Sequence, residues 1–167
     1  MTFNKEKIII RPEKLFEYEK VDKLIYKAFA EQHSIETGKF MMEHFREERK
    51  KDTFIPELSL VAVLENGTIV GSIIIDKVQP IEYATIPWKE KLSEDEVMVI
   101  HLLMVRPSMS GKGIASSLIK FATELAQKNS CRALRLDTGS QNIPALSLYQ
   151  KNGFEIIASA SKKVGDV

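Results

Sequence analysis

Apolar residues recur along the chain with two different spacings, which predict alternating strands and helices. The β-branched run at 7–12 ends at a proline and predicts a strand. Residues 13–32 and 37–51 carry apolar residues three and four positions apart, which predicts two amphipathic helices. We expect these residues on their apolar faces: Leu15, Tyr18, Val21, Leu24, Ile25, Ala28 and Phe29 in the first, and Phe40, Met41, His44 and Phe45 in the second. Two apolar runs within 58–78 flank an Asn-Gly pair at 66–67, which indicates a tight hairpin.

The second half of the chain alternates strands and helices in the manner of an α/β sheet. Residues 80–95 hold two prolines and no clean period, which predicts a long surface loop. The nearly continuous apolar run 96–105 is typical of a strand covered on both faces. The remaining predicted elements are a helix over 113–129, a strand over 131–138, a helix over 143–154 and a strand over 154–160. The order β α α β β β α β α β predicts one α/β domain over residues 1–167, with hairpin and crossover pairing in one sheet.

The composition is that of an ordinary globular domain. The chain has 167 residues, of which 44% are hydrophobic and 28% charged, and a formal net charge of +1. Both charge signs are interleaved on the helices, so we expect no nucleic-acid partner. Cys131 is the single cysteine, which excludes an intramolecular disulfide and a Cys-based zinc site. We expect a cytoplasmic protein, because no run resembles a signal peptide or a membrane span.

A glycine-flanked lysine follows the apolar run 96–105 and precedes a predicted helix. At such a helix start, the unpaired N–H groups of Gly111, Lys112 and Gly113 favour an anion, and glycine lets a phosphate oxygen approach the backbone. Ser110 could add a hydroxyl donor. A P-loop is excluded, because Arg106 stands where that motif needs glycine and Gly113 where it needs Ser or Thr. Alone, the stretch fits a phosphate site or a plain turn equally well.

The next crossover places three functional residue types on one helical face. Asn142, Ala145 and Tyr149 stand at i, i+3 and i+7, where Asn can donate and accept, Ala leaves space and the phenol can hold a proton. The alternative is that Asn142 caps the helix and Tyr149 is a core aromatic. Because ligands of open α/β sheets gather at the carboxyl ends of strands, we expect both helix starts to border one site.

Together, the stretches 102–119 and 135–154 resemble the acetyl-CoA-binding core of the GNAT superfamily of N-acetyltransferases. The pyrophosphate signature of that family is Gln or Arg, any two residues, Gly, any residue, then Gly or Ala. Here it is matched by Ser110, Gly111, Lys112, Gly113, Ile114 and Ala115, and only the first position departs. The second stretch matches at Asn142, Pro144, Ala145, Leu148, Tyr149, Gly153 and Phe154. The resemblance implies the GNAT fold, a mixed sheet of six or seven strands with about four helices.

The resemblance also implies a reaction. The family's bulged and splayed strand, here 97–105, pairs with pantetheine through Leu103, Met104 and Val105, and an N–H near Met104 would stabilise the oxyanion. The signature residues would hold pyrophosphate, and Asn142, Ala145, Leu148 and Tyr149 would complete the acetyl-CoA site. Tyr149 would protonate the departing thiolate. The acetyl group would pass directly to a primary amine, with no covalent enzyme intermediate and no role for Cys131.

The base and the acceptor stay open. His101 is the leading base, since by strand alternation it shares a face with Leu103, and Glu96 is the second choice. A hydrogen-bonded core histidine is the alternative interpretation of His101. Residues 30–50, which include His33 and His44, and 80–96 should shape the acceptor site. No spacing suggests a metal.

Two other functions and one structural question remain beside this interpretation. A non-enzymatic acyl-CoA sensor could use the same fold, and so could an acyltransferase that takes longer acyl groups or a hydroxyl acceptor. The short polar segment after residue 160 also leaves open whether another chain completes the sheet, so a homodimer is possible. We expect a small-molecule or peptide amine as the partner, and no membrane.

Overall fold

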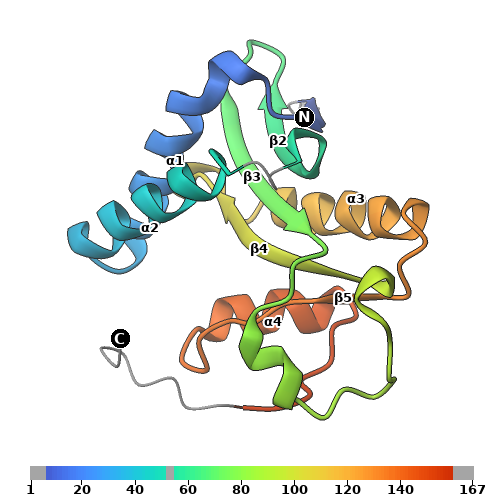
Figure 1. Cartoon of the computed structure of the whole chain (residues 1–167). Helices are drawn as coiled ribbons and strands as arrows, with labels where there is room; N and C mark the ends of the chain where they lie inside the picture. The colour runs from blue at the N-terminus through green and yellow to red at the C-terminus, as the bar shows by residue number, and fades with distance from the viewer. Residues whose placement is uncertain (1–6, 52–54, 160–167) are drawn as a thin grey trace, which may run out of the picture.

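A mixed sheet crosses the middle of the molecule (Figure 1). The fold is described from a computed structural model, for residues 7–51 and 55–159. Its five strands stand in chain order across the sheet: β1 (Ile8–Pro12), β2 (Ser59–Leu64), β3 (Ile69–Asp76), β4 (Val97–Val105) and β5 (Ala133–Arg135). Neighbours from β1 to β4 are antiparallel, and β5 runs parallel to β4. The sheet thus combines hairpin and crossover pairing, as the sequence predicts.

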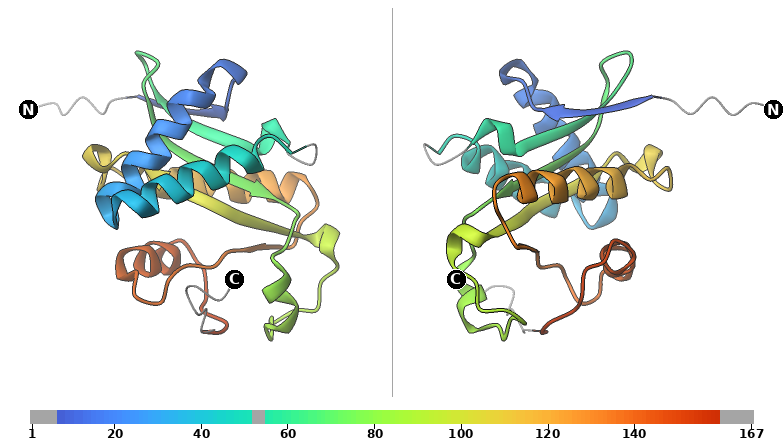
Figure 2. Two further views of the ribbon diagram at one scale, coloured as in Figure 1. Left: turned by 60° about the vertical axis from the view of Figure 1, so that its left-hand side comes forward. Right: turned by 90° about the vertical axis from the view of Figure 1, so that its right-hand side faces the viewer.

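Helices cover both faces of the sheet (Figure 2). The helices are α1 (Tyr18–Gln32), α2 (Ile35–Glu48), α3 (Ile114–Lys128) and α4 (Ile143–Lys151). On one face, α1 buries Val21 and Ile25 in a cluster with Val61 and Ile74 of the sheet. On the other face, α3 packs its apolar side against β2, β3 and β4. By contrast, α4 lies beyond β5, at the far side of the sheet from β1, and has no fully buried residue.

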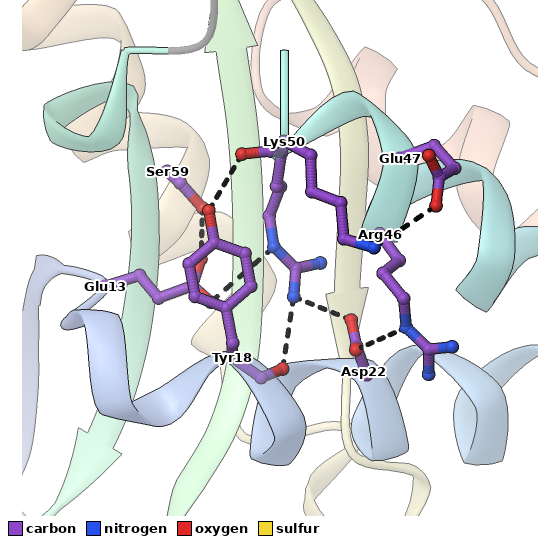
Figure 3. A network of polar contacts seen from close by, with 8 residues as sticks. Glu13, Tyr18, Asp22, Arg46, Glu47, Lys50 and Ser59 are labelled. Atoms are coloured by element: carbon purple, nitrogen blue, oxygen red, sulfur yellow. Dashed lines mark hydrogen bonds and ion pairs between the residues drawn. The ribbon is translucent and has the colours of Figure 1, made fainter. Parts of the chain in front are cut away.

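A network of charged side chains lies buried between the start of α1 and the end of α2 (Figure 3). The side chain of Arg49 is 0% exposed; it donates to Asp22 at 2.6 Å and to the carbonyl of Tyr18 at 3.1 Å. Glu13 lies 3.7 Å from the Arg49 Nε and accepts from Ser59 of β2 at 2.8 Å. Burial raises the pKa of Glu13, and Arg49 opposes the rise. The network thus joins the start of α1 to the end of α2 and, through Glu13, to the first residue of β2. A buried charge is costly without a partner, so loss of one member should destabilise this region.

Most predicted elements of the first half are confirmed, with shifted ends. The strand at 8–12, both helices and the hairpin are present, and Gly67 in the hairpin loop has a φ of +86°. The predicted apolar faces are wrong at three positions, and one of them is His44 on α2, which is exposed. Leu15 is 82% exposed because residues 15–17 form a separate 3-10 turn before α1, and Phe40 on α2 is 65% exposed.

The prediction of six or seven strands is wrong, since the described residues form five. The predicted strand over 131–138 shortens to the three residues of β5. Residues 154–159 have no regular structure, and residue 160 lies outside the described part of the chain. A three-residue strand offers little edge for a further strand to pair with, which is the physical reason that the predicted strand at 154–159 is not formed.

Candidate active site

A β-bulge in β4 decides where His101 lies. Ile74 of β3 is paired with Leu102 and the next residue, Ile75, with Ile100, so His101 is an extra residue in β4. One extra residue reverses the alternation of faces beyond it. Accordingly, Ile100 and Leu103 both pack on the α3 side, whereas Leu102 packs on the α1 side. The bulge that the family resemblance implies is therefore present.

His101 is held by a carboxylate from the neighbouring strand. Its Nε2 lies 2.6 Å from Oδ1 of Asp76, the last residue of β3, and the two side chains are 24% and 33% exposed. Asp76 is opposite Val99, whose side chain lies on the face that Tyr83 covers. The prediction that His101 shares a face with Leu103 is thus wrong, because the bulge turns His101 to the opposite face. No pattern in the sequence indicated that Asp76 would reach it.

The strands β4 and β5 pair only over three residues and then separate. The last pair is Val99 with Arg135. Beyond it, within the described residues, no strand is paired with the β5 side of 100–105. This stretch contains the predicted pantetheine contacts Leu103, Met104 and Val105. Its free N–H and C=O groups are suited to an amide-rich ligand.

The turn between β4 and α3, called the cradle below, has a backbone geometry that suits an anion. Gly111 and Gly113 have φ of +77° and +78°, values that L side chains adopt with strain. In the described chain, no backbone acceptor takes the N–H of Gly111, Lys112 or Gly113. Gly113 is the N-cap of α3 and offers no side-chain cap, so the N–H groups of the first helical turn are also available. The loop is exposed, and Lys112 adds a positive charge; these residues fit a phosphate group.

The residues predicted on α4 lie on one side of the helix start. Asn142 is the N-cap, and its Oδ1 accepts from the N–H of Ala145 at 3.2 Å, so the capping role is confirmed. Tyr149 is half-buried and meets Phe154 edge to face at 5.7 Å. Burial, with a smaller contribution from the charge of Asp137, raises the pKa of the Tyr149 phenol. The group therefore stays protonated across the neutral range.

Glu96 is already engaged in local contacts. It accepts from the Ser93 hydroxyl at 3.0 Å, in a capping box before β4, and Arg132 lies 3.6 Å away. These Ser93 hydrogen bonds, followed by the Arg132 charge, lower the pKa of Glu96. His33, the residue that follows α1, and His44 on α2 are both exposed, and His44 stacks with Phe40 at 6.1 Å. Of the candidate bases, His101 is the one that a neighbouring carboxylate, Asp76, holds in place beside the part of β4 where the pairing with β5 has ended.

Part of the predicted surface loop over 80–95 packs beside β5 through specific side-chain contacts. Tyr83 is 6% exposed and donates to Asp137 at 2.9 Å, while the Trp88 indole donates to the carbonyl of Tyr83 at 2.9 Å. Burial, then Asp137, strongly raises the pKa of Tyr83. Arg135 packs over the Trp88 ring, with 4.0 Å between its guanidinium carbon and the ring centroid. The aperiodic loop sequence carried no signal for these contacts.

A groove lies between the outer side of α3 and the end of α4. It has a volume of about 510 Å³ and is lined on α3 by Ser116, Ser117 and Lys120. Asn152, which follows α4, also lines the groove, and its side-chain amide donates to the Ser116 hydroxyl at 3.1 Å. The sequence motifs did not indicate this groove.

The described part of the chain contains neither a metal-binding cluster nor a membrane-spanning helix. Among residues 7–51 and 55–159, no three His, Cys, Asp or Glu side chains are arranged to hold a metal ion. No helix in the same ranges has the length and apolar character needed to cross a membrane.

The fold is that of a known class of transferase. The model of the acetyltransferase (GNAT) family matches residues 23–154, and the chain belongs to this family.

Individual relatives match the chain over shorter lengths. N-acetyltransferase MJ1207 of Methanocaldococcus jannaschii is 37% identical over 68 residues, which are 41% of this chain and 30% of the relative. Streptothricin acetyltransferase of Escherichia coli is 36% identical over 69 residues, 41% of this chain and 36% of the relative. The chain thus spans about a third of the length of these curated relatives.

A solved structure extends the likeness over the whole fold. The structure of AAC(6')-Iy in complex with the bisubstrate analog CoA-S-monomethyl-acetylneamine has a TM-score of 0.65 to this chain. It is 18% identical and covers 96% of this chain and 99% of its own. At this identity, the likeness shows the shared fold.

Proposed function

We propose that the protein transfers an acetyl group from acetyl-CoA to a primary amine by direct attack in a ternary complex. The observation that carries the proposal is the separation of β5 from β4 after the pair Val99–Arg135, beside the anion cradle. An opened strand edge next to a phosphate-binding helix start suits a ligand with one amide-rich end and one pyrophosphate. Coenzyme A has both.

Acetyl-CoA would be held by backbone groups more than by side chains. The N–H groups around Gly111 and Gly113, with Lys112, would bind pyrophosphate. Ser110 replaces the Gln or Arg usual in the family, so this cradle depends on the backbone. The full set of residues proposed for acetyl-CoA is Leu103, Met104, Val105, Ser110, Gly111, Lys112, Gly113, Ile114, Ala115, Asn142, Ala145, Leu148 and Tyr149.

His101 is the proposed base. A lysine-like amine titrates near pH 10.4 in water and must lose a proton before it can attack. The contact of 2.6 Å to Asp76 engages Nε2, so Nδ1 is the nitrogen left to accept that proton, directly or through water. Glu96 is a poorer candidate, because its lowered pKa and its contacts with Ser93 favour a carboxylate that does not take up protons.

Tyr149 is the proposed acid for the departing thiolate. When bound, acetyl-CoA supplies an activated thioester. The raised pKa of Tyr149 keeps its proton in place until sulfur becomes anionic. A backbone N–H near Met104, on the free edge of β4, would stabilise the oxyanion, a role worth a few kcal/mol for a well-placed donor.

The names of two relatives support a small-molecule amine as the acceptor. One acetylates streptothricin, and the other is bound to an analogue of CoA joined to acetylneamine. The acceptor of this chain would enter on the α1 side of the sheet, where His101 and Asp76 lie.

The experiment is a screen of primary amines, covering polyamines, amino acids, aminoglycosides and peptides, for release of CoA thiol from acetyl-CoA. We expect turnover with at least one amine and its loss in Tyr149→Phe. Tight CoA binding without turnover on any amine would favour the non-enzymatic sensor and overturn the proposal.

A further inference from the structure

Arg135 of β5 is a buried cation without an acidic partner. It is 9% exposed, and its Nη1 donates to the Gln79 side-chain oxygen at 2.8 Å. None of the ion pairs formed by the described residues includes Arg135, and no second hydrogen bond of its guanidinium is present among them. A guanidinium has five N–H donors, so most of them are free to bind a ligand. Arginines with so little exposure are normally paired with an acidic group, and Arg135 has no such partner among the described residues.

The position of Arg135 connects it to the reacting end of the proposed site. Arg135 is paired with Val99, and Val99 is paired with Asp76, so these three residues form one row across β5, β4 and β3. Residues paired in this way point to the same face, which is the face of His101. His101 is two residues further along β4, about 8 Å from Arg135 between Cα atoms by strand spacing. Both residues lie where the two strands begin to separate.

A pocket opens between Arg135 and residues 79–94, and His101 and Asp76 are outside its lining. It has a volume of about 630 Å³ and is lined by Arg135 together with the loop that follows β3, including Tyr83, Ile86 and Trp88. This volume and lining suit a small molecule. The guanidinium carbon of Arg135 lies 4.0 Å from the centroid of the Trp88 ring. This stacking limits the orientations that the N–H donors of Arg135 can take.

We propose that Arg135 binds a carboxylate of the acceptor, so that the preferred substrates are small amines that also carry a carboxylate. The inference rests on the proposed acetyl transfer and names its substrate class. Arginine matches a carboxylate with two parallel hydrogen bonds, and the distance to His101 leaves room for the amine of the same molecule to reach the base. The acidic residues of the pocket rim, Glu90 and Glu94, are exposed and do not pair with Arg135.

The test compares amines in matched pairs, each an amino acid and its carboxamide, by kcat/KM for CoA release. The wild-type protein should prefer the carboxylate at least about tenfold, a modest value for a charge-assisted pair. Arg135→Gln should remove that preference and leave kcat/KM for the carboxamides near wild type. Arg132→Gln is the matched control, since Arg132 is on the same segment, is exposed, and pairs with Glu90 and Glu96. Its preference should be unchanged.

The outcomes separate the inference from the proposed function. Equal rates for carboxylates and carboxamides, or turnover only with amines that lack a carboxylate, would overturn the inference and leave acetyl transfer standing. An equal loss on both members of each pair in Arg135→Gln would assign Arg135 a structural role, holding the loop through Gln79 and Trp88, and would likewise overturn the inference. Absence of turnover with every amine would instead remove the proposed function.

Discussion

The cradle can be tested by comparing Gly113→Asp with Gly113→Asn, because the two side chains have nearly the same shape and differ in charge. A Cβ at Gly113 meets nothing within 4 Å, so neither side chain is blocked. Both residues must adopt the φ of +78°, at a cost of about 1 kcal/mol of stability, and both can cap a helix. They differ only in one negative charge. About 5 Å from a phosphate, that charge is worth about 3 kcal/mol at an effective dielectric constant of 20 and half as much at 40.

Because Gly113 is exposed, we expect the weaker part of that range, and Gly113→Asp should bind acetyl-CoA about 10- to 100-fold more weakly than Gly113→Asn. Isothermal titration calorimetry at two salt concentrations measures both dissociation constants, and the gap should narrow at higher salt. Gly67→Asp is a second control, since Gly67 has a φ of +86° and equally open surroundings in a distant hairpin. In the same assay, Ser110→Arg should tighten binding. Equal affinity of the Gly113→Asp and Gly113→Asn proteins would refute the cradle.

Three other substitutions test the base, the acid and the buried charges. Tyr149→Phe should lower kcat about 100-fold with little change in KM for acetyl-CoA. Because the pKa of the Tyr149 phenol is raised, the wild-type protein should not lose activity through this group below about pH 10. A pH–rate profile of both proteins checks these two expectations. Asp76→Asn should lower kcat about tenfold or more by freeing the imidazole, but should add no loss in a His101→Gln background, which steady-state kinetics of the double variant measures. Arg49→Ala should cost about 3–5 kcal/mol in urea unfolding because the buried Glu13 loses its cation, while Asp22 keeps only Arg46, and a loss below about 1 kcal/mol would contradict the role of the network.

The sequence predicted the outer parts of the site better than its centre. The cradle and the face of α4 depend on local spacing, so Gly113, Asn142 and Tyr149 stand where the motifs place them. The face of His101 depends on register between strands. The run 97–105 is apolar almost throughout and shows no alternation that would reveal an extra residue. The contact with Asp76 depends on the same register and could not be read from one strand.

The loop and the C-terminal part show a second limit. Tyr83 and Trp88 are ordered by contacts with Asp137 and Arg135, which stand much later in the chain, and no local period marks them. The predicted strand at 154–160 has a good local pattern, but a strand needs a partner edge, and β5 has only three residues. In both cases a long-range contact decides the structure, and short-range pattern does not contain it.

The bulge in β4 lies where the proposed base and the free strand edge occur together. An ordinary strand would keep Ile100 and Leu102 on the same side and leave His101 in register with β3. The extra residue instead brings His101 against Asp76, and it strengthens the local twist of β4. The pairing with β5 ends at Val99, two residues before the bulge. The inserted residue accounts for the direction of His101, and it lies next to the free backbone of 100–105 and to Arg135 at the point of separation. The proposed base, the proposed thioester contacts and the proposed carboxylate site therefore depend on the same local geometry.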